Sequence, residues 1–418
     1  MTGTTGPHDR APHDPSSLDS SSLDSSSLDP RSLDPRSLDP RAFSASGRPR
    51  ARGVGVPFAG TPGPGNAITD VPGVEVGYVT LVHGDGPLAV GAGPVRTGVT
   101  AIHPRGRADG RPVAAGVHAL NGNGEMTGLS WLEETGSLGT PVTVTNTHAV
   151  GAAHRGTIDW IVRERPEQAR AWLLPVAAET WDGYLNDING DHVRPAHAVA
   201  ALDAARPGPV AEGCVGGGTG MNCYGFKGGS GTASRQVGYG RDTFTVGAFV
   251  QANFGSRKEL VVAGVPVGRE LADDNPMETT DWLAPPGAGS VIVVVATDAP
   301  LLPGQCKALA RRVPLGLART GTSGSHFSGD IFLAFSTANA GALASSFPQG
   351  EPGDDEFDTL RFVPWGRMDP FYEAVVEAVE EAVVNVLVAA DTTIGRDGHR
   401  SPALPIDRLR ALLAEHLG

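Results

Sequence analysis

The chain of 418 residues has few of the features that mark secreted, metal-binding or membrane-spanning proteins. Its three cysteines, Cys214, Cys223 and Cys306, are too few for a disulfide framework and lack metal-site spacing, which fits a reducing compartment. No apolar run reaches the roughly 18 residues of a membrane span, and the N-terminus has no signal-peptide pattern. These absences predict a cytoplasmic protein that is not attached to a membrane.

Positive charge is also scarce. Lysine and arginine number 33 against 46 aspartates and glutamates, a net charge of −13. Nucleic acids and anionic membranes select basic surfaces, so neither is an expected partner. The hydrophobic content of 40% is enough for a substantial core, and the 57 glycines and 34 prolines indicate many turns in a sheet-rich fold.

The first 47 residues form a low-complexity segment. Leucine recurs every five residues between Ser16 and Arg41, a period that matches neither a helix nor a strand. Prolines follow at the same spacing from Pro30. We therefore expect residues 1–47 to be a disordered tail without a catalytic role, with the fold beginning near Val54.

Apolar patterning in the rest of the chain predicts an α+β fold. Strands are expected at Val74–Val79, Val95–Ile102, Val142–Thr147, Thr243–Gln251, Glu259–Val265, Val291–Ala296 and Asp330–Ser336. Helices are expected at Thr157–Arg170, Pro195–Arg206, Gly304–Thr320, Phe371–Ala390 and Ile406–Leu417. In the long helix Phe371–Ala390, acidic residues such as Glu377 and Glu381 are expected on the face opposite the apolar one. Strands in two groups, with helices between and after them, favour a layered α+β sandwich over a doubly wound parallel sheet.

The segment Gly287–Pro300 is the most informative one. Val291–Ala296 is apolar without alternation, as in a central strand that is covered on both faces. Ser290 stands at the start of this strand, and Val265–Gly287 before it has the composition of a long loop. Ser290 is therefore expected at the mouth of a buried strand.

A serine in this position has two chemical possibilities. Its hydroxyl can attack the Gly289 carbonyl, because a glycine tolerates strained backbone, and hydrolysis of the resulting ester would cut the chain before Ser290. The new α-amine, with an ordinary pKa of roughly 7.7–8, can then act as the base for its own hydroxyl. The alternative is that Gly289 and Ser290 form an ordinary turn before a strand.

Four other segments are candidates for a site. Residues 213–232 contain nine glycines but match neither the dinucleotide-binding nor the P-loop pattern, so they favour close backbone approach around a small pocket, or simple turns. Polar clusters occur at Asn121–Gly128, Glu179–Asn189 and Ser323–Asp330. Ser328 and Asp330 are placed to meet Ser290 across neighbouring strands, whereas His326 is a weaker candidate for a Ser-His-Asp triad, because a lone loop histidine is usually unrelated.

These segments together resemble the DmpA family of self-processing aminopeptidases, which includes L-aminopeptidase/D-esterases and β-peptidyl aminopeptidases. The resemblance covers residues 64–412 and rests on colinear motifs that include LNGNGEMTG, ETWDGYLNDINGDHV, GGGTGMNCYGFKGGSGTASR, VGAFVQANFG, GSVIVVVATDAPLLP and LARTGTSGSHFSGDIFLAFSTAN. Members cut their own chain before a serine that becomes both N-terminus and nucleophile. The resemblance implies a four-layer αββα fold and cleavage between Gly289 and Ser290, which divides the catalytic domain into 48–289 and 290–418.

The same resemblance assigns roles to individual residues. Ser328 and Asp330 match the serine and the acid that orient the nucleophile, and Asn253 matches the amide of the oxyanion hole. Glu179 matches the carboxylate that receives the amino group of the substrate. Relatives complete the oxyanion hole with an aromatic hydroxyl near this glutamate, but here Trp181 is the nearest aromatic and Tyr184 follows, so the second donor is open between these positions.

An aminopeptidase acting on small peptides or on amino acid amides and esters is therefore expected, without a metal or an organic cofactor. Family resemblance further implies a homo-oligomer, a tetramer of processed αβ units. Two alternatives remain: an acyltransferase like the ornithine acetyltransferases, which process before a threonine, and a non-enzymatic scaffold whose junction stays intact.

Overall fold

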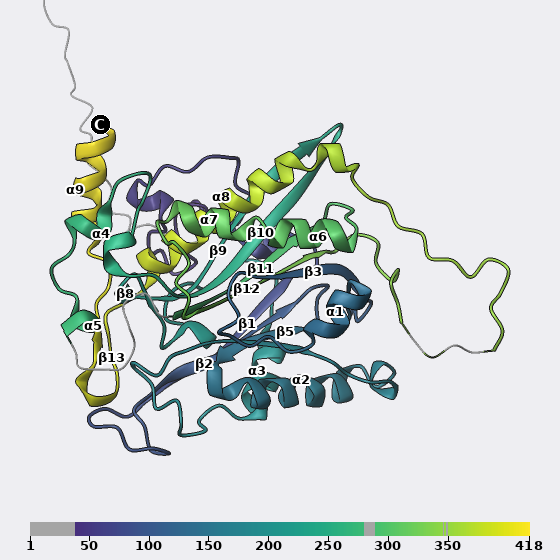
Figure 1. Cartoon of the computed structure of the whole chain (residues 1–418), viewed down its shortest axis with the longest axis horizontal. Helices are drawn as coiled ribbons and strands as arrows, with labels where there is room; N and C mark the ends of the chain where they lie inside the picture. The colour runs from purple at the N-terminus through teal and green to yellow at the C-terminus, as the bar shows by residue number, and fades with distance from the viewer. Residues whose placement is uncertain (1–37, 280–288, 346, 348–349) are drawn as a thin grey trace, which may run out of the picture.

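Two β-sheets lie face to face, and helices cover the outer face of each (Figure 1). The computed structural model describes residues 38–279, 289–345, 347 and 350–418. In Figure 1 the layers run from α6, α7 and α8 through the two sheets to α2 and α3. This arrangement confirms the predicted four-layer αββα sandwich.

The smaller sheet has the strand order β1-β2-β5-β6. Its strands are β1 (Glu75–His83), β2 (Val95–His103), β5 (Val142–Asn146) and β6 (Val176–Thr180). β5 and β6 are parallel, so their carboxyl ends lie at the same edge, whereas β1 and β2 are antiparallel. Helices α2 (Val150–Glu164) and α3 (Pro195–Ala204) pack against it through a cluster that includes Trp160 and Leu202.

The larger sheet has the order β4-β3-β12-β11-β10-β9. Its strands are β4 (Ser137–Leu138), β3 (Val113–Ala119), β12 (Ser328–Ser336), β11 (Gly289–Thr297), β10 (Asp242–Asn253) and β9 (Gly229–Tyr239). β11 is central, antiparallel to β10 and parallel to β12, and Val291 to Ala296 are fully buried. The prediction of a central strand covered on both faces is confirmed.

Three helices cover the outer face of this larger sheet: α6 (Pro303–Ala310), α7 (Val313–Arg319) and α8 (Asp369–Ala389). A separate apolar cluster, with Phe249, Ile292 and Phe335, fills the space between the two sheets. The remaining elements are α1 (Leu129–Thr135), β7 (Asn222–Cys223), β8 (Phe226–Lys227), α4 (Val267–Glu270), α5 (Pro276–Thr279), β13 (Thr393–Ile394), β14 (Arg400–Ser401) and α9 (Ile406–Leu417).

Two predicted helices differ from the structure by more than two residues. The helix expected at Thr157–Arg170 begins at Val150 and ends at Glu164, two residues before Pro166. The single helix expected at Gly304–Thr320 is divided into α6 and α7. Pro314 explains the break, because it has no N–H for a bond to the carbonyl four residues earlier. The apolar spacing still predicted the buried side chains correctly, since Leu309, Val313 and Leu317 are all buried.

The prediction of a strand at Glu259–Val265 is wrong. The segment starts with a 3₁₀ turn, Arg257–Glu259, in which Glu259 Oε2 accepts from Ser256 N at 2.8 Å. Ala263 and Gly264 then have positive φ angles of 50° and 81°, which reverse the chain. The long loop expected at Val265–Gly287 contains the short helices α4 and α5, and its residues 280–287 lie outside the described residues.

The acidic face expected on α8 is only partly exposed. Glu381 is 0% exposed and accepts from Arg235 and Arg52, each at 2.7 Å. Glu377 is buried as well, with Arg235 at 3.4 Å. An apolar periodicity cannot distinguish a solvated carboxylate from one that is paired inside the fold. Here the arginine that pairs with both carboxylates is Arg235 of β9.

Ordered contacts also begin earlier than Val54. Phe43 forms a β-bridge with Pro49, and Arg50 is buried against Glu212 at 2.8 Å. Residues 1–37 of the predicted tail lie outside the described residues. Beyond the tail, β10 pairs with β11 and β3 pairs with β12, so segments 48–289 and 290–418 build one sheet together. A cut before Ser290 would thus divide one domain rather than separate two.

Candidate active site

Ser290 is a buried hydroxyl at the second residue of β11. Its side chain is accessible to solvent at only 2%, and its Oγ accepts two hydrogen bonds. Trp181 N donates at 3.0 Å, and Asn253 Nδ2 donates at 3.4 Å. Asn253 is the last residue of β10 and lies directly opposite Ser290 in the antiparallel ladder. The sheet register therefore brings the predicted nucleophile and the predicted oxyanion amide together.

Position 289 requires glycine because the main chain of Asn253 lies very close to it. A Cβ atom built on it would lie 2.0 Å from Asn253 O, which no side chain can accommodate. Gly289 is not among the glycines with positive φ, so the expected strained backbone is not what selects glycine here. The main-chain carbonyl of Asn253 is what excludes a larger residue next to Ser290.

Ser328 and Asp330 lie on β12, the parallel neighbour of β11, where they pair with Gly289 and Val291. Ser328 Oγ donates to Asp330 Oδ1 at 2.5 Å, and Asn121 Nδ2 donates to the other carboxylate oxygen at 3.2 Å. Asp330 is 4% exposed, and burial raises its pKa above the ordinary aspartate value. The predicted pair is thus a hydrogen-bonded unit on the strand next to Ser290.

Glu179 lies near the carboxyl end of β6 and is 3% exposed. One carboxylate oxygen accepts from Glu125 N at 2.9 Å, and the other accepts from Thr147 Oγ1. Burial raises the pKa of Glu179, while these two hydrogen bonds oppose the shift. Among the described residues no basic side chain lies within ion-pair distance of this carboxylate, although His148 is near enough to lower its pKa. A cation that binds here would therefore compensate the charge of Glu179.

The two aromatic candidates near Glu179 have different surroundings. Trp181 reaches Ser290 through its main-chain N–H. Tyr184 is fully buried, its hydroxyl donates to Arg400 O at 3.3 Å, and its ring stacks on His399 with centroids 4.7 Å apart. Between them, Asp182 accepts from Asn186 Nδ2 at 3.0 Å, and burial raises its pKa to about 7.

Sequence reasoning missed Thr147, the role of Asn121 and the main-chain N–H of Trp181. One available signal was the expected strand Val142–Thr147, because residues at the carboxyl ends of parallel strands meet at one edge. Thr147 follows β5 at the edge where Glu179 nears the end of β6. The Trp181 donor leaves no side-chain signal at all, since any residue type supplies a main-chain N–H.

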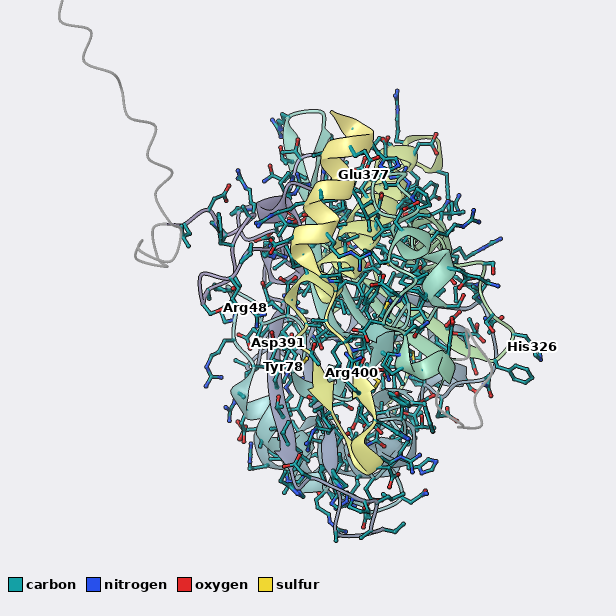
Figure 2. All side chains as sticks on the ribbon, turned by 90° about the vertical axis from the view of Figure 1, so that its left-hand side faces the viewer. Arg48, Tyr78, His326, Glu377, Asp391 and Arg400 are labelled. Atoms are coloured by element: carbon teal, nitrogen blue, oxygen red, sulfur yellow. The ribbon has the colours of Figure 1, made fainter. Side chains whose placement is uncertain are left out.

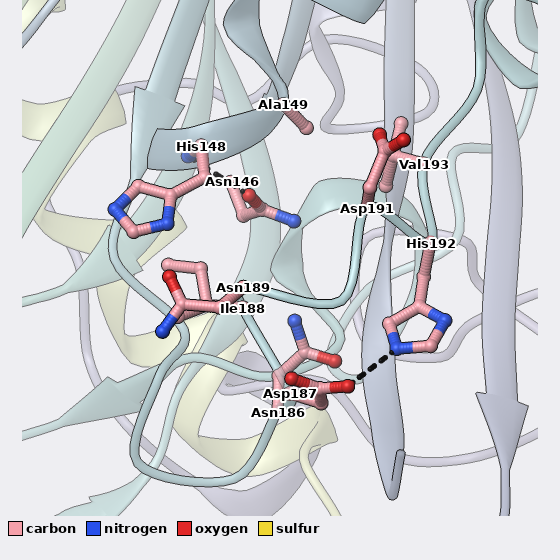
Figure 3. A pocket seen from close by; sticks show the side chains of 10 residues that line it. All are labelled: Asn146, His148, Ala149, Asn186, Asp187, Ile188, Asn189, Asp191, His192 and Val193. Carbon is pink, nitrogen blue, oxygen red and sulfur yellow. Dashed lines mark hydrogen bonds and ion pairs between the residues drawn. The ribbon is translucent and has the colours of Figure 1, made fainter. Parts of the chain in front are cut away.

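A polar pocket of about 250 Å³ lies beside this site (Figure 3). Its lining includes Asn146, His148, Asp187 and His192, and His192 Nε2 lies 2.8 Å from Asp187 Oδ2. Neither Ser290 nor Asn253 lines it. Thr147 adjoins both the pocket and the site, because it lies in the chain between the lining residues Asn146 and His148 and donates to Glu179.

His326 is exposed at the edge of the molecule (Figure 2), where its ring contacts Phe327 with centroids 5.1 Å apart. The structure does not bring it into the cluster around Ser290. Within the described ranges, no three histidine, cysteine or acidic side chains are grouped as a metal would require. Among the same residues, no helix combines the length and apolarity needed to cross a bilayer.

Comparisons with known proteins agree on one family. The profile of Peptidase family S58 matches residues 66–401. The β-peptidyl aminopeptidase BapA of Sphingosinicella microcystinivorans is 52% identical over 383 residues, covering 90% of this chain and 94% of its own. BapA of Sphingosinicella xenopeptidilytica is 45% identical over 378 residues, covering 87% of this chain and 91% of its own.

Solved structures give the same result. The L-aminopeptidase D-Ala-esterase/amidase of Ochrobactrum anthropi, described as a variant of the Ntn hydrolase fold, has a TM-score of 0.80 and 46% identity, covering 88% of this chain and 99% of its own. A β-aminopeptidase from Burkholderia sp. has a TM-score of 0.77 and 48% identity, covering 88% and 98%. These matches favour a peptidase over an acyltransferase or a scaffold. The chain belongs to Peptidase family S58 and is a self-processing aminopeptidase with an N-terminal nucleophile.

Proposed function

We propose that the chain cuts its own Gly289–Ser290 bond and that Ser290 is the nucleophile of the mature enzyme. The observation that carries this proposal is the buried Ser290 Oγ at the start of β11, with N–H donors from Trp181 and Asn253 directed at it. Attack of Oγ on the Gly289 carbonyl converts the amide to an ester. This break of the amide bond frees the α-amine of Ser290. Water then hydrolyses the ester, which releases the carboxylate of Gly289 and restores the Ser290 hydroxyl.

In the processed enzyme, the Ser290 α-amine takes the proton of Oγ as the hydroxyl attacks the substrate carbonyl. Asn253 Nδ2 and Trp181 N stabilise the negative charge on the tetrahedral intermediate, and the leaving amine takes the proton. Water hydrolyses the acyl-enzyme in the same way. The hydrogen-bonded pair of Ser328 and Asp330 orients the nucleophile from the neighbouring strand. Of the two candidates for the second oxyanion donor, the Trp181 segment is favoured over the Tyr184 hydroxyl, because Trp181 N donates to Ser290 Oγ whereas the Tyr184 hydroxyl donates to Arg400 O.

We propose that Glu179 receives the ammonium group of the substrate. It is buried, its hydrogen bonds within the described part of the chain come from Thr147 Oγ1 and Glu125 N, and Trp181, two residues later, contacts Ser290. An ammonium bound there fixes the distance between the N-terminus of a substrate and the bond that is cut. This geometry releases one N-terminal residue at a time.

We further propose that the enzyme prefers substrates with an N-terminal β-amino acid, since two relatives that align with most of this chain are β-peptidyl aminopeptidases. The test compares p-nitroanilides of β-alanine, L-alanine and D-alanine with the processed protein. The β-alanyl substrate is expected to have the highest kcat/KM. A higher kcat/KM for either α-amino acid would contradict the preference but not the aminopeptidase activity.

The role of Asn253 makes a second prediction. Asn253→Ala should lower kcat by roughly 10²–10³, about the loss on removing one oxyanion donor, because this donor acts on charge that develops in the transition state. KM should change much less. Steady-state kinetics on the processed fraction measure both, and an unchanged kcat with a raised KM would instead make Asn253 a substrate contact.

We also propose that the processed αβ units form a homo-oligomer, which family resemblance implies to be a tetramer. We propose that the protein is cytoplasmic. Exposed apolar side chains between β12 and α8 support association, since Phe357 is 86% exposed and Phe362 is 49% exposed. The free cysteines Cys214, Cys223 and Cys306 support a reducing compartment.

A further inference from the structure

Lys227 is a cation without access to solvent. Its side chain is 0% exposed, and no carboxylate in the described part of the chain forms an ion pair with it. Its Nζ donates to main-chain carbonyls instead, to Met221 O at 2.6 Å and Gly228 O at 2.9 Å. Gly218 O is at 3.5 Å. Burying a charge without a counter-charge costs folding free energy, so a role in holding the loop alone does not account for this lysine.

The position of Lys227 is fixed by a short hairpin. β7 and β8 pair Asn222 with Lys227, and the connecting residues Tyr224 and Gly225 have φ angles of 55° and 67°, as in a type I′ turn. Lys227 N donates to Pro402 O at 2.7 Å. The ammonium group is thereby held over the first strand of its own hairpin.

The peptide group between Met221 and Asn222 connects this cation to the site. Its carbonyl oxygen accepts from Lys227 Nζ at 2.6 Å, and its N–H donates to Asn253 Oδ1 at 2.9 Å. The amide of Asn253 then donates through Nδ2 to Ser290 Oγ at 3.4 Å. The path from Lys227 to the nucleophile therefore consists of three hydrogen bonds, one peptide group and one side-chain amide.

Such a series has two physical effects. Because Asn222 N–H occupies Oδ1 of Asn253, the NH₂ group of that amide is the one directed at Ser290. The charge of Lys227 also polarises the peptide group, which strengthens the next donor in the series. Asn222, Asn253 and Ser290 are 7%, 6% and 2% exposed, so water screens this effect very little.

We propose that Lys227 is a positioning residue of the oxyanion site, which orients and polarises the Asn253 amide through the Met221–Asn222 peptide. The proposal rests on the proposed role of Asn253 as an oxyanion donor. It assigns a function to the glycine-rich segment 213–232 that the sequence left open. Gly228 supports the same geometry, because a Cβ there would lie 2.4 Å from Ala252 O and 2.9 Å from Asn222 N.

The test is a double-mutant cycle on processed protein, with the cut fraction quantified by mass spectrometry. Lys227→Gln keeps a donor near the carbonyls but removes the charge. It should lower kcat by about tenfold or more, with KM within about threefold, because a hydrogen bond to a charged group is replaced by a neutral one. In an Asn253→Ala background, the same change should lower kcat by less than about twofold, since the series then ends before Ser290.

Arg257→Gln is the matched control. Arg257 is 2% exposed and also donates to carbonyls of this hairpin, Tyr224 O at 3.0 Å and Gly225 O at 2.5 Å, but it has no bond to the Met221–Asn222 peptide. It should lower stability and leave kcat per folded, processed molecule within about threefold. Equal kcat losses from Lys227→Gln in both backgrounds, or an unchanged kcat in Lys227→Gln, would overturn the proposal. A normal kcat in Asn253→Ala would instead overturn the role of Asn253 itself.

A second measurement needs no change at Lys227. Burial lowers its pKa, against the influence of Asp182, Cys214 and Cys223, so the charge is lost at a lower pH than in an ordinary lysine. The ratio of kcat between the unmodified enzyme and Asn253→Ala should therefore fall as pH rises from about 7 to about 10.5, while the titration of the Ser290 α-amine cancels in the ratio. A constant ratio over this range would also overturn the proposal.

Discussion

Ser290→Ala is expected to leave the protein as a single uncut chain of 43.1 kDa without aminopeptidase activity. The unmodified protein should instead contain two chains, 1–289 and 290–418, that separate on denaturation without a reducing agent. The reason is chemical: alanine has no hydroxyl to attack the Gly289 carbonyl, and the ester that water must hydrolyse never forms. Denaturing electrophoresis and intact-mass measurement report both forms directly.

Two controls give this experiment its specificity. Ser290→Thr keeps the hydroxyl and should still be cut to a measurable extent. Ser323→Ala removes an exposed hydroxyl that donates to Glu259 Oε1 at 3.0 Å, on the loop before β12, and should be cut normally. N-terminal sequencing of the smaller chain should read Ser-Val-Ile-Val. A different N-terminus, or normal cutting of the alanine variant, would assign the nucleophile to another residue.

The central strand could be predicted because its environment is uniform. Val291 to Ala296 have apolar neighbours on both faces, and a sequence without polar alternation indicates such a position. The motifs around Ser290, Asn253, Glu179, Ser328 and Asp330 could likewise be located from family resemblance. Whether these residues come together in space depends on the register between strands. The antiparallel register of β10 and β11 places Asn253 opposite Ser290.

Other features depended on contacts between distant segments. Glu381 looks like a surface residue of α8 until Arg235 on β9 and Arg52 near the N-terminus are seen to pair with it. The break between α6 and α7 follows from Pro314, a local signal that was outweighed by the continuous apolar spacing of Leu309, Val313 and Leu317. The Trp181 donor is a main-chain group, and the connection from Lys227 passes through a peptide bond. A sequence pattern cannot detect either of these main-chain groups, because every residue type supplies them.

Glu179→Gln is expected to lower kcat/KM for a substrate with a free amine by about 100-fold or more. The carboxylate is 3% exposed, and a buried charge pair broken from one side costs about 3–5 kcal/mol, because the remaining ammonium has no partner. An N-acetylated substrate brings no charge and should already be poor, so its kcat/KM should change far less. Self-cleavage should persist, since the Gly289–Ser290 bond presents no free amine to Glu179.

The measurement compares a free and an acetylated aminoacyl anilide with both proteins, together with the extent of processing. Glu377→Gln serves as the matched control, because Glu377 is also a buried carboxylate, 7% exposed, but pairs with Arg235 on the outer side of the larger sheet. It should lower stability without distinguishing the two substrates. If Glu179→Gln lowered kcat/KM equally for both substrates while processing stayed intact, Glu179 would support catalysis or folding in general. The enzyme would then have to select free N-termini through another group.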